Sequence, residues 1–229
     1  MGVSALSGIS KLWFGLSCNK EVSVVQDLML GQVYVSNIKM ALGRELSMDS
    51  IKFLGIAGSL RQASTNRGLL RAAQGSLPQD IRLDIADLSD IPFYNQDISA
   101  KPAAVERVLK QIGEADALVF ASTEYNYSLA PALKNILDWA SREPNNALLT
   151  GKPVAIMGAG GGMGTSRAQY HLRQVCVFLD LQPLNKPEVF ANAFAGSFNA
   201  DGNLTDEKLN KLIAEQMQAL MAKVAAARR

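Results

Sequence analysis

GSLRQASTNRGLL, residues 58–70, follows directly on the apolar run Ile51–Ala57. This order predicts a buried strand, a polar loop and the first turns of a helix. The first N–H groups of a helix lack intrahelical partners and carry the positive end of its dipole, so anions bind there readily. Arg61 can add a forked, charge-assisted contact to phosphate. The side chains that predict a phosphate monoester site are Ser59, Arg61, Ser64, Thr65 and Asn66.

Helix capping is the alternative interpretation of two of these side chains. Ser64 and Asn66 are both of the residue types preferred at helix N-caps. Taken singly, either one is explained by capping alone. The clustering of five polar side chains directly after a buried first strand favours phosphate.

The totals of the chain limit its function class. With 229 residues it is long enough for one sizeable domain. A net charge of +2 gives no electrostatic reason to expect nucleic acid as a partner. A single histidine, His171, excludes metal sites built from several histidines, and we expect no metal. No apolar stretch approaches the length of a membrane span, so we expect no membrane partner.

The two cysteines indicate the compartment. Cys18 and Cys176 lie far apart and form no CxxC or zinc spacing. A reduced, cytoplasmic setting is therefore the expectation.

Residues 1–47 differ in character from the rest of the chain. The segment mixes glycine, serine and apolar residues without sustained periodicity, and its short apolar run around Trp13 fits a secretory signal poorly. We expect the domain to begin at Met48 and to span 48–229. Residues 1–47 are expected to be an upstream extension outside the core domain; the alternative is an accessory segment that packs on the domain or on a partner chain.

From residue 50 onward, apolar runs alternate with segments of helical periodicity. Such alternation predicts an α/β fold: a doubly wound, five-stranded parallel sheet with helices on both faces and right-handed crossovers. A phosphate loop after the first strand favours the flavodoxin-like order 2-1-3-4-5, with the ligand at the carboxyl ends of strands 1 and 3. The predicted strands are 51–57, 81–88 (near an edge), 117–121, 153–157 and 187–190, and the predicted helices are 66–74, 101–113, 131–141, 166–179 and 204–226.

The loop after the third strand reads STEYNYSLAP, residues 122–131. A flavin ring needs apolar or aromatic cover on its faces and a few oriented hydrogen bonds at its edge. Tyr125, Asn126 and Tyr127 suit these surroundings, and backbone N–H groups of a tight turn suit the edge. The alternative is that the tyrosines pack on the domain or line a subunit contact.

Three segments together carry a family resemblance. GSLRQASTNRGLL (58–70), STEYNYSLAPALKNILDWASR (122–142) and GTSRAQYHLRQVCVFLD (164–180) occur in this order. Together they resemble the NAD(P)H-dependent FMN reductase family, and in particular its quinone and chromate reductase branch. The resemblance runs from about residue 51 to 189.

The resemblance implies a chemistry and a set of site residues. FMN would be bound, NADPH or NADH would reduce it, and a quinone, chromate or similar acceptor would then oxidise it in a ping-pong cycle. No protein side chain is required as an acid or base, because the cofactor carries the difficult step. The loop 59–66 would hold the FMN phosphate. The residues implied beside the isoalloxazine are Thr123, Glu124, Tyr125, Asn126 and Tyr127, with Gly160 and Gly161 near the flavin edge.

One departure from the family pattern and the absence of two other nucleotide-binding motifs bear on this assignment. Thr123 stands where the family usually has proline, which changes the rigidity of the turn but leaves backbone donors available. The glycine-rich stretch 158–164 is not a dinucleotide fingerprint, because Met163 occupies the position of the third glycine. No GxxxxGK[ST] motif is present, so the sequence gives no support to an ATPase.

Several further side chains have expected roles around the site. We expect Glu124 to shape its loop rather than act as a general base, and Trp139 to belong to the core. Arg142 is a candidate for contact with an anionic acceptor. The resemblance places helix 166–179 at a subunit contact of a homodimer or homotetramer, where Arg167, Tyr170 and Glu188 are expected to form a hydrogen-bond network. The alternative for this helix is a solvated basic face.

Two other functions fit the same fold. A flavodoxin-like electron carrier is one, but carriers usually present an acidic face and this chain is slightly basic. A flavin-free regulatory domain is the other, since a fold does not imply a function. The retained Arg61, Ser64 and Asn66 speak against it.

Overall fold

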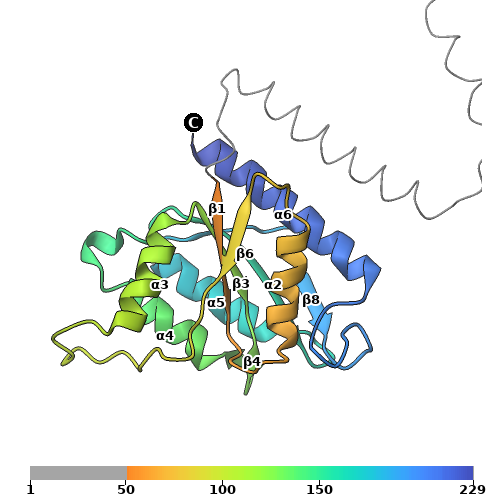
Figure 1. Cartoon of the computed structure of the whole chain (residues 1–229), viewed down its shortest axis with the longest axis horizontal. Coiled ribbons are helices and arrows are strands. Elements are labelled where there is room, and N and C mark those ends of the chain that lie inside the picture. Colours follow the sequence, from red (N-terminus) through yellow and green to blue (C-terminus); the bar gives the residue numbers. More distant parts are fainter. Residues whose placement is uncertain (1–50, 229) are drawn as a thin grey trace, which may run out of the picture. The chain divides into compact units, whose positions relative to one another are not determined.

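The computed structural model describes residues 51–228, which form a parallel sheet covered by helices on both faces (Figure 1). The sheet order is β2-β1-β3-β6-β7, and β8 also pairs with β6. Counting the main strands along the chain, this is the expected flavodoxin-like order 2-1-3-4-5. The strands are β1 (Lys52–Ala57), β2 (Arg82–Ile85), β3 (Ala117–Ala121), β6 (Pro153–Gly160), β7 (Gln182–Pro183) and β8 (Val189–Asn192).

The fifth position of the sheet is shared by two short strands. β7 pairs with the start of β6, at Pro153 and Val154, and β8 pairs with its end, from Met157 to Gly160. The sequence predicted a single strand over 187–190, so it missed β7 and placed β8 two residues early. β2 is an edge strand as expected, but it is limited to Arg82–Ile85.

The helices divide into two layers. In Figure 1, α3 and α4 lie on one side of the strands, and α2 and α6 lie on the other. α5 joins the α3 and α4 side, because its buried Leu172 and Cys176 belong to the same core cluster. The helices are α2 (Thr65–Gly75), α3 (Ala103–Glu114), α4 (Pro131–Ala140), α5 (Ser166–Phe178) and α6 (Glu207–Ala227), with a short 3-10 turn at Pro144–Asn146.

Strand register explains which side chains share one face of the sheet. Leu54 pairs with Leu118, and Ile56 pairs with Phe120, so alternate residues of neighbouring strands face the same helices. These large side chains form the core beneath α3, α4 and α5, together with Trp139, which is only 3% exposed. The prediction that Trp139 is a core residue is therefore confirmed.

The start of α6 differs from the prediction. The sequence placed it at residue 204, whereas the helix begins at Glu207 with Asp206 as its N-cap. The Asp206 carboxylate accepts hydrogen bonds from the N–H groups of Leu209 and Lys208 and from the Ser197 hydroxyl. These bonds, led by that from Leu209, lower the pKa of Asp206. An acidic cap whose charge is fixed by backbone donors fits the positive end of the helix dipole.

The predicted domain boundary at Met48, and the extension 1–47, lie outside the described residues. Within residues 51–228, no helix has the length and apolar character needed to cross a membrane. In the same range, no group of three or more side chains has the composition of a metal site.

Cys176 is fully buried, and burial raises the pKa of its thiol to about 12. Because only a thiolate reacts, at pH 8 about one thiol in ten thousand would be reactive. We expect iodoacetamide at pH 8 to leave Cys176 unmodified in the folded protein and to modify it fully in guanidinium. Mass spectrometry of the peptide containing Cys176 measures this. Equal labelling rates with and without guanidinium would contradict the prediction.

Candidate active site

The loop between β1 and α2 builds a cradle of donors at the carboxyl edge of the sheet. Ser64 is the N-cap of α2, and its Oγ accepts a hydrogen bond from Arg67 N–H at 3.3 Å. The capping interpretation is therefore confirmed for Ser64, although its hydroxyl can still donate its own proton. Ser59 is buried, and its Oγ accepts from Arg61 N–H at 3.4 Å. The first contact caps the helix, and the second orders the turn that precedes it.

The N–H groups of Thr65 and Asn66 have no hydrogen-bond partner among residues 51–228. They belong to the first turn of α2, where N–H groups are free to bind an oxyanion. Beside them, the exposed Arg61 guanidinium donates from Nη2 to Ala63 O at 2.9 Å. Two free backbone donors, a hydroxyl and a cation within one loop fit a phosphate group.

The Asn66 side chain is used elsewhere. Its Nδ2 donates to Ala159 O at 2.8 Å, and its Oδ1 accepts from Ala159 N–H at 2.9 Å. Asn66 is only 3% exposed, so the side chain lies in the interior between α2 and β6. The residue is at the predicted place, but only its backbone N–H is available to a phosphate.

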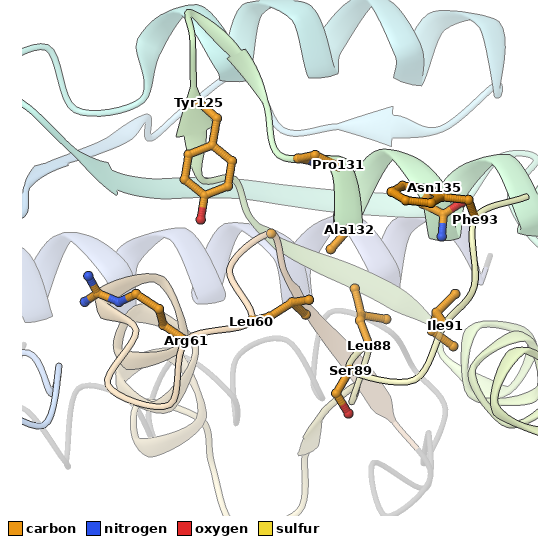
Figure 2. Close-up of a pocket in the computed structure, with 11 residues that line it drawn as sticks. Leu60, Arg61, Leu88, Ser89, Ile91, Phe93, Tyr125, Pro131, Ala132 and Asn135 are labelled. Atoms are coloured by element: carbon orange, nitrogen blue, oxygen red, sulfur yellow. The ribbon is translucent and has the colours of Figure 1, made fainter.

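A cleft of about 340 Å³ lies beside the cradle. Figure 2 shows Tyr125 projecting toward the loop that carries Leu60 and Arg61. Leu60, Tyr125 and Phe93 are 54%, 47% and 77% exposed, so the cleft presents apolar surface to solvent. Its lining comes from three loops and the start of α4: Gly58, Leu60, Arg61, Leu88, Ser89, Ile91, Phe93, Tyr125, Pro131, Ala132 and Asn135. Apolar walls with a few polar groups suit a flat aromatic ring.

A two-stranded hairpin after β3 was not predicted. β4 (Glu124–Tyr125) pairs antiparallel with β5 (Ser128–Leu129). The connecting residues Asn126 and Tyr127 have φ values of 49° and 67°, as a type I′ turn requires. Asn is common at such positions, but Tyr is not, so the sequence lacked the Asn-Gly signal that marks these turns.

The hairpin is joined to α5 through Glu124. Its carboxylate accepts a hydrogen bond from Arg167 Nε at 2.8 Å and lies 2.7 Å from Arg167 Nη2. The Arg167 guanidinium carbon is 3.8 Å from the centroid of the Tyr127 ring. Arg167, Glu124 and Tyr127 are thus brought together within one chain.

The predicted network of Arg167, Tyr170 and Glu188 is not formed within the chain. Glu188 is paired with Lys186 at 2.6 Å, and this hydrogen bond lowers the pKa of Glu188. Tyr170 is 65% exposed and lies beside His171, with ring centroids 6.3 Å apart. A network between two chains stays a prediction.

Arg142 lies apart from the cleft. It follows the last turn of α4, whereas the cleft is lined by Pro131, Ala132 and Asn135 from the first half of that helix. Its guanidinium donates to Ser141 Oγ and lies 5.6 Å from the centroid of the Tyr94 ring. The structure therefore does not bring Arg142 together with the cradle residues.

Ser122 and Thr123 place two buried hydroxyls at the end of β3. Neither Oγ has a hydrogen-bond partner among the described residues. A Cβ added at Gly58 would lie 3.1 Å from Thr123 N and 3.0 Å from Ala130 Cβ, so the two loops meet closely here. Unpartnered buried hydroxyls are uncommon, and they often mark functional positions.

The glycines after β6 have two different roles. A Cβ at Gly160 would lie 2.3 Å from Gly164 O, so this glycine is needed for the loop to pack on itself. A Cβ at Gly161 meets nothing within 4 Å, which leaves open space beside this residue. Of the two predicted residues, Gly161 is the one with room for a ligand.

The sequence also missed a loop, around Gly202, that packs against α2 and the cradle. Gly202 lies against α2, because a Cβ at Gly68 would come within 1.8 Å of Gly202 O. Arg71 Nε donates to Asn203 Oδ1 at 2.6 Å, which fixes the same loop to α2. A Cβ added at Gly202 would lie 2.7 Å from Ala63 O, so this loop also packs against the backbone of the cradle. Glycines at 68 and 202 were the available signal, but nothing in the sequence pairs them.

Comparisons with known proteins agree with this geometry. An NAD(P)H-dependent FMN reductase of Pseudomonas aeruginosa is 54% identical over 175 residues, covering 75% of this chain and 94% of the relative. An NAD(P)H:quinone oxidoreductase of Solanum tuberosum is 47% identical over 180 residues, covering 75% and 92%. Among solved structures, a flavoenzyme NAD(P)H:acceptor oxidoreductase of Paracoccus denitrificans matches with a TM-score of 0.69 and 29% identity, covering 76% of this chain and 97% of that one.

A family model matches most of the described residues. The model of the NADPH-dependent FMN reductases covers residues 51–196, which include the cradle, the hairpin and the glycine loop. With this match and a relative at 54% identity, the chain belongs to the NADPH-dependent FMN reductase family.

Proposed function

We propose that the chain binds FMN at the cradle and transfers electrons from NADPH or NADH to quinones. The observation that best supports this proposal is the pair of free N–H groups of Thr65 and Asn66 beside Arg61. The family to which the chain belongs supports it as well. Once bound, FMN would supply the redox chemistry that connects the nicotinamide to the acceptor. The enzyme class, an FMN-dependent oxidoreductase, follows from the family and its relatives.

The residues of the chain have distinct roles in this proposal. Arg61, the Ser64 hydroxyl and the free N–H groups of α2 hold the phosphate. The hairpin backbone at residues 124–127 and the open side of Gly161 border the isoalloxazine. The apolar cleft beside Leu60 and Tyr125 offers cover for the ring of a quinone.

Finer features of the function are also proposed. Chromate is a further acceptor, on the resemblance to the chromate reductase branch. The chain acts as a homodimer or homotetramer. The exposed apolar and aromatic side chains of Tyr170, Val177 and Phe178 on α5 support this assembly. A cytoplasmic location fits two cysteines without disulfide spacing.

The first experiment is an absorption spectrum of the purified protein before and after anaerobic NADPH. We expect a flavin spectrum that bleaches with NADPH and returns when a quinone is added. Bound flavin that responds to neither NADPH nor NADH would indicate an electron carrier instead. A colourless protein that FMN cannot reconstitute would refute the proposal.

Replacing Arg61 with alanine tests the phosphate contact. We expect the FMN dissociation constant to rise roughly tenfold, because one exposed charge-assisted contact is lost. Riboflavin lacks the phosphate, so its affinity should stay unchanged. Fluorescence titration of the apoprotein measures both ligands, with Arg142→Ala as the matched control because Arg142 lies outside the cradle. Equal weakening for FMN and riboflavin would contradict the assignment.

A further inference from the structure

Glu124 connects two loops that are separate in the sequence. Its side chain is only 8% exposed, and it comes from the hairpin after β3. One carboxylate oxygen, Oε1, binds Arg167 Nε at 2.8 Å, and the other, Oε2, accepts from Ala168 N–H at 3.2 Å. Both partners lie in the first turn of α5, which directly follows the glycine loop.

The start of α5 lacks a cap of its own. Thr165 occupies the N-cap position, but its hydroxyl accepts from Gln169 Nε2 at 3.1 Å and makes no capping bond to a backbone N–H of the helix. The first turn contains no acidic residue. The first N–H groups of a helix need acceptors, and its positive end favours a carboxylate. Glu124 supplies both from another part of the chain, since it accepts from Ala168 N–H.

Arg167 extends this connection to the tip of the hairpin. Its guanidinium lies over the ring of Tyr127, 3.8 Å from the centroid, in a cation–π contact. Tyr127 has a φ of 67°, a conformation that costs energy for a bulky residue and persists only where its surroundings hold it. Glu124 orients Arg167, and Arg167 in turn covers Tyr127.

We propose that Glu124 is a positioning residue that fixes the hairpin against the glycine loop and the start of α5. These are the two loops that border the isoalloxazine in the proposed function, on which the flavin part of this inference rests. Both carboxylate oxygens already accept hydrogen bonds, Oε1 from the Arg167 guanidinium and Oε2 from Ala168 N–H. Glu124 acts through the spacing of the two loops.

Glu124→Gln tests the inference with little change in size. Arg167 and Ala168 donate to different oxygens of Glu124, and glutamine replaces one of these oxygens with an NH2 group, so one of the two donors would face another donor. The matched control is Glu114→Gln, because Glu114 ends α3 and makes only long, exposed ion pairs at 3.9 and 4.0 Å. By amide hydrogen exchange of the apoprotein, Glu124→Gln should speed exchange roughly tenfold at residues 124–129 and at Ala168. Amides of β3 should be unaffected.

The second measurement concerns the bound flavin. Glu124→Gln should raise the FMN dissociation constant roughly tenfold and change the visible circular dichroism of bound FMN, whereas Glu114→Gln should do neither. Arg167→Met is the companion variant should Glu124→Gln fail to fold. Arg167→Met keeps the hydrogen bond between Glu124 and Ala168 N–H, so amide exchange should become faster in the hairpin and stay unchanged at Ala168.

The outcomes separate this inference from the proposed function. Unchanged exchange at the hairpin and Ala168 in Glu124→Gln overturns the connection between the loops. If Glu124→Gln speeds amide exchange in the hairpin but leaves the circular dichroism of bound FMN unchanged, Glu124 does not position the loops for the flavin. A wild-type apoprotein that binds no FMN overturns the proposed function, and the exchange data still decide whether Glu124 joins the two loops.

Discussion

Asn66→Ala is expected to lower the free energy of unfolding by about 3 kcal/mol, because it leaves two buried backbone groups of Ala159 without partners. Asn66 and Ala159 are both about 3% exposed, so water cannot replace the lost bonds. The bonds also attach the start of α2 to β6, and their loss should loosen the phosphate cradle. Denaturant unfolding of the apoprotein measures the effect.

Two further variants make this test specific. Asn66→Asp can accept from Ala159 N–H but cannot donate to Ala159 O, and it buries a charge, so it should also be strongly destabilising. Asn210→Ala is the matched control, since the Asn210 side chain has no hydrogen-bond partner within residues 51–228 and is partly exposed. If Asn66→Ala and Asn210→Ala destabilise equally, the Asn66 side chain does not hold α2 to the sheet.

Gly68→Ala is expected to destabilise the protein by about 2 kcal/mol through overpacking. An added Cβ would lie 1.8 Å from Gly202 O, which is backbone and cannot rotate away. Alanine improves helix propensity by about 1 kcal/mol, but this gain is smaller than the cost of displacing the loop. The displacement should break the bond between Arg71 and Asn203 and loosen the packing of this loop on the cradle, so FMN affinity should fall as well.

Gly75→Ala is the matched control in the same helix. A Cβ at Gly75 meets nothing within 4 Å, so only the gain in helix propensity applies and stability should rise slightly. If the contact between Gly68 and Gly202 is decisive, Gly68→Ala lowers the melting temperature and Gly75→Ala raises it in thermal unfolding. A rise in melting temperature for both variants would show that the loop yields freely.

Local patterns in the sequence were enough to predict the fold. Continuous apolar runs for the central strands and helical periodicity between them reflect burial of each segment against its neighbours, which short windows of sequence record. The order of the sheet followed from this alternation and from the position of the phosphate loop after the first strand. The short strands β7 and β8 were harder, because each pairs with only part of β6 and leaves little periodicity.

The sequence predicted where the site lies, but it predicted less well which side chains point into it. By itself, the sequence determined the cradle at the start of α2, the loop after β3 and the family, because these depend on residues close together in the chain. Only the tertiary structure decided that Asn66 binds Ala159, 93 residues away, and that Glu124 binds Arg167, 43 residues away. It also placed Arg142 outside the cleft. The direction of a buried polar side chain depends on the hydrogen-bond partner that lies beside it in the folded protein. That partner can come from a distant part of the chain, so the neighbouring residues in the sequence do not reveal it.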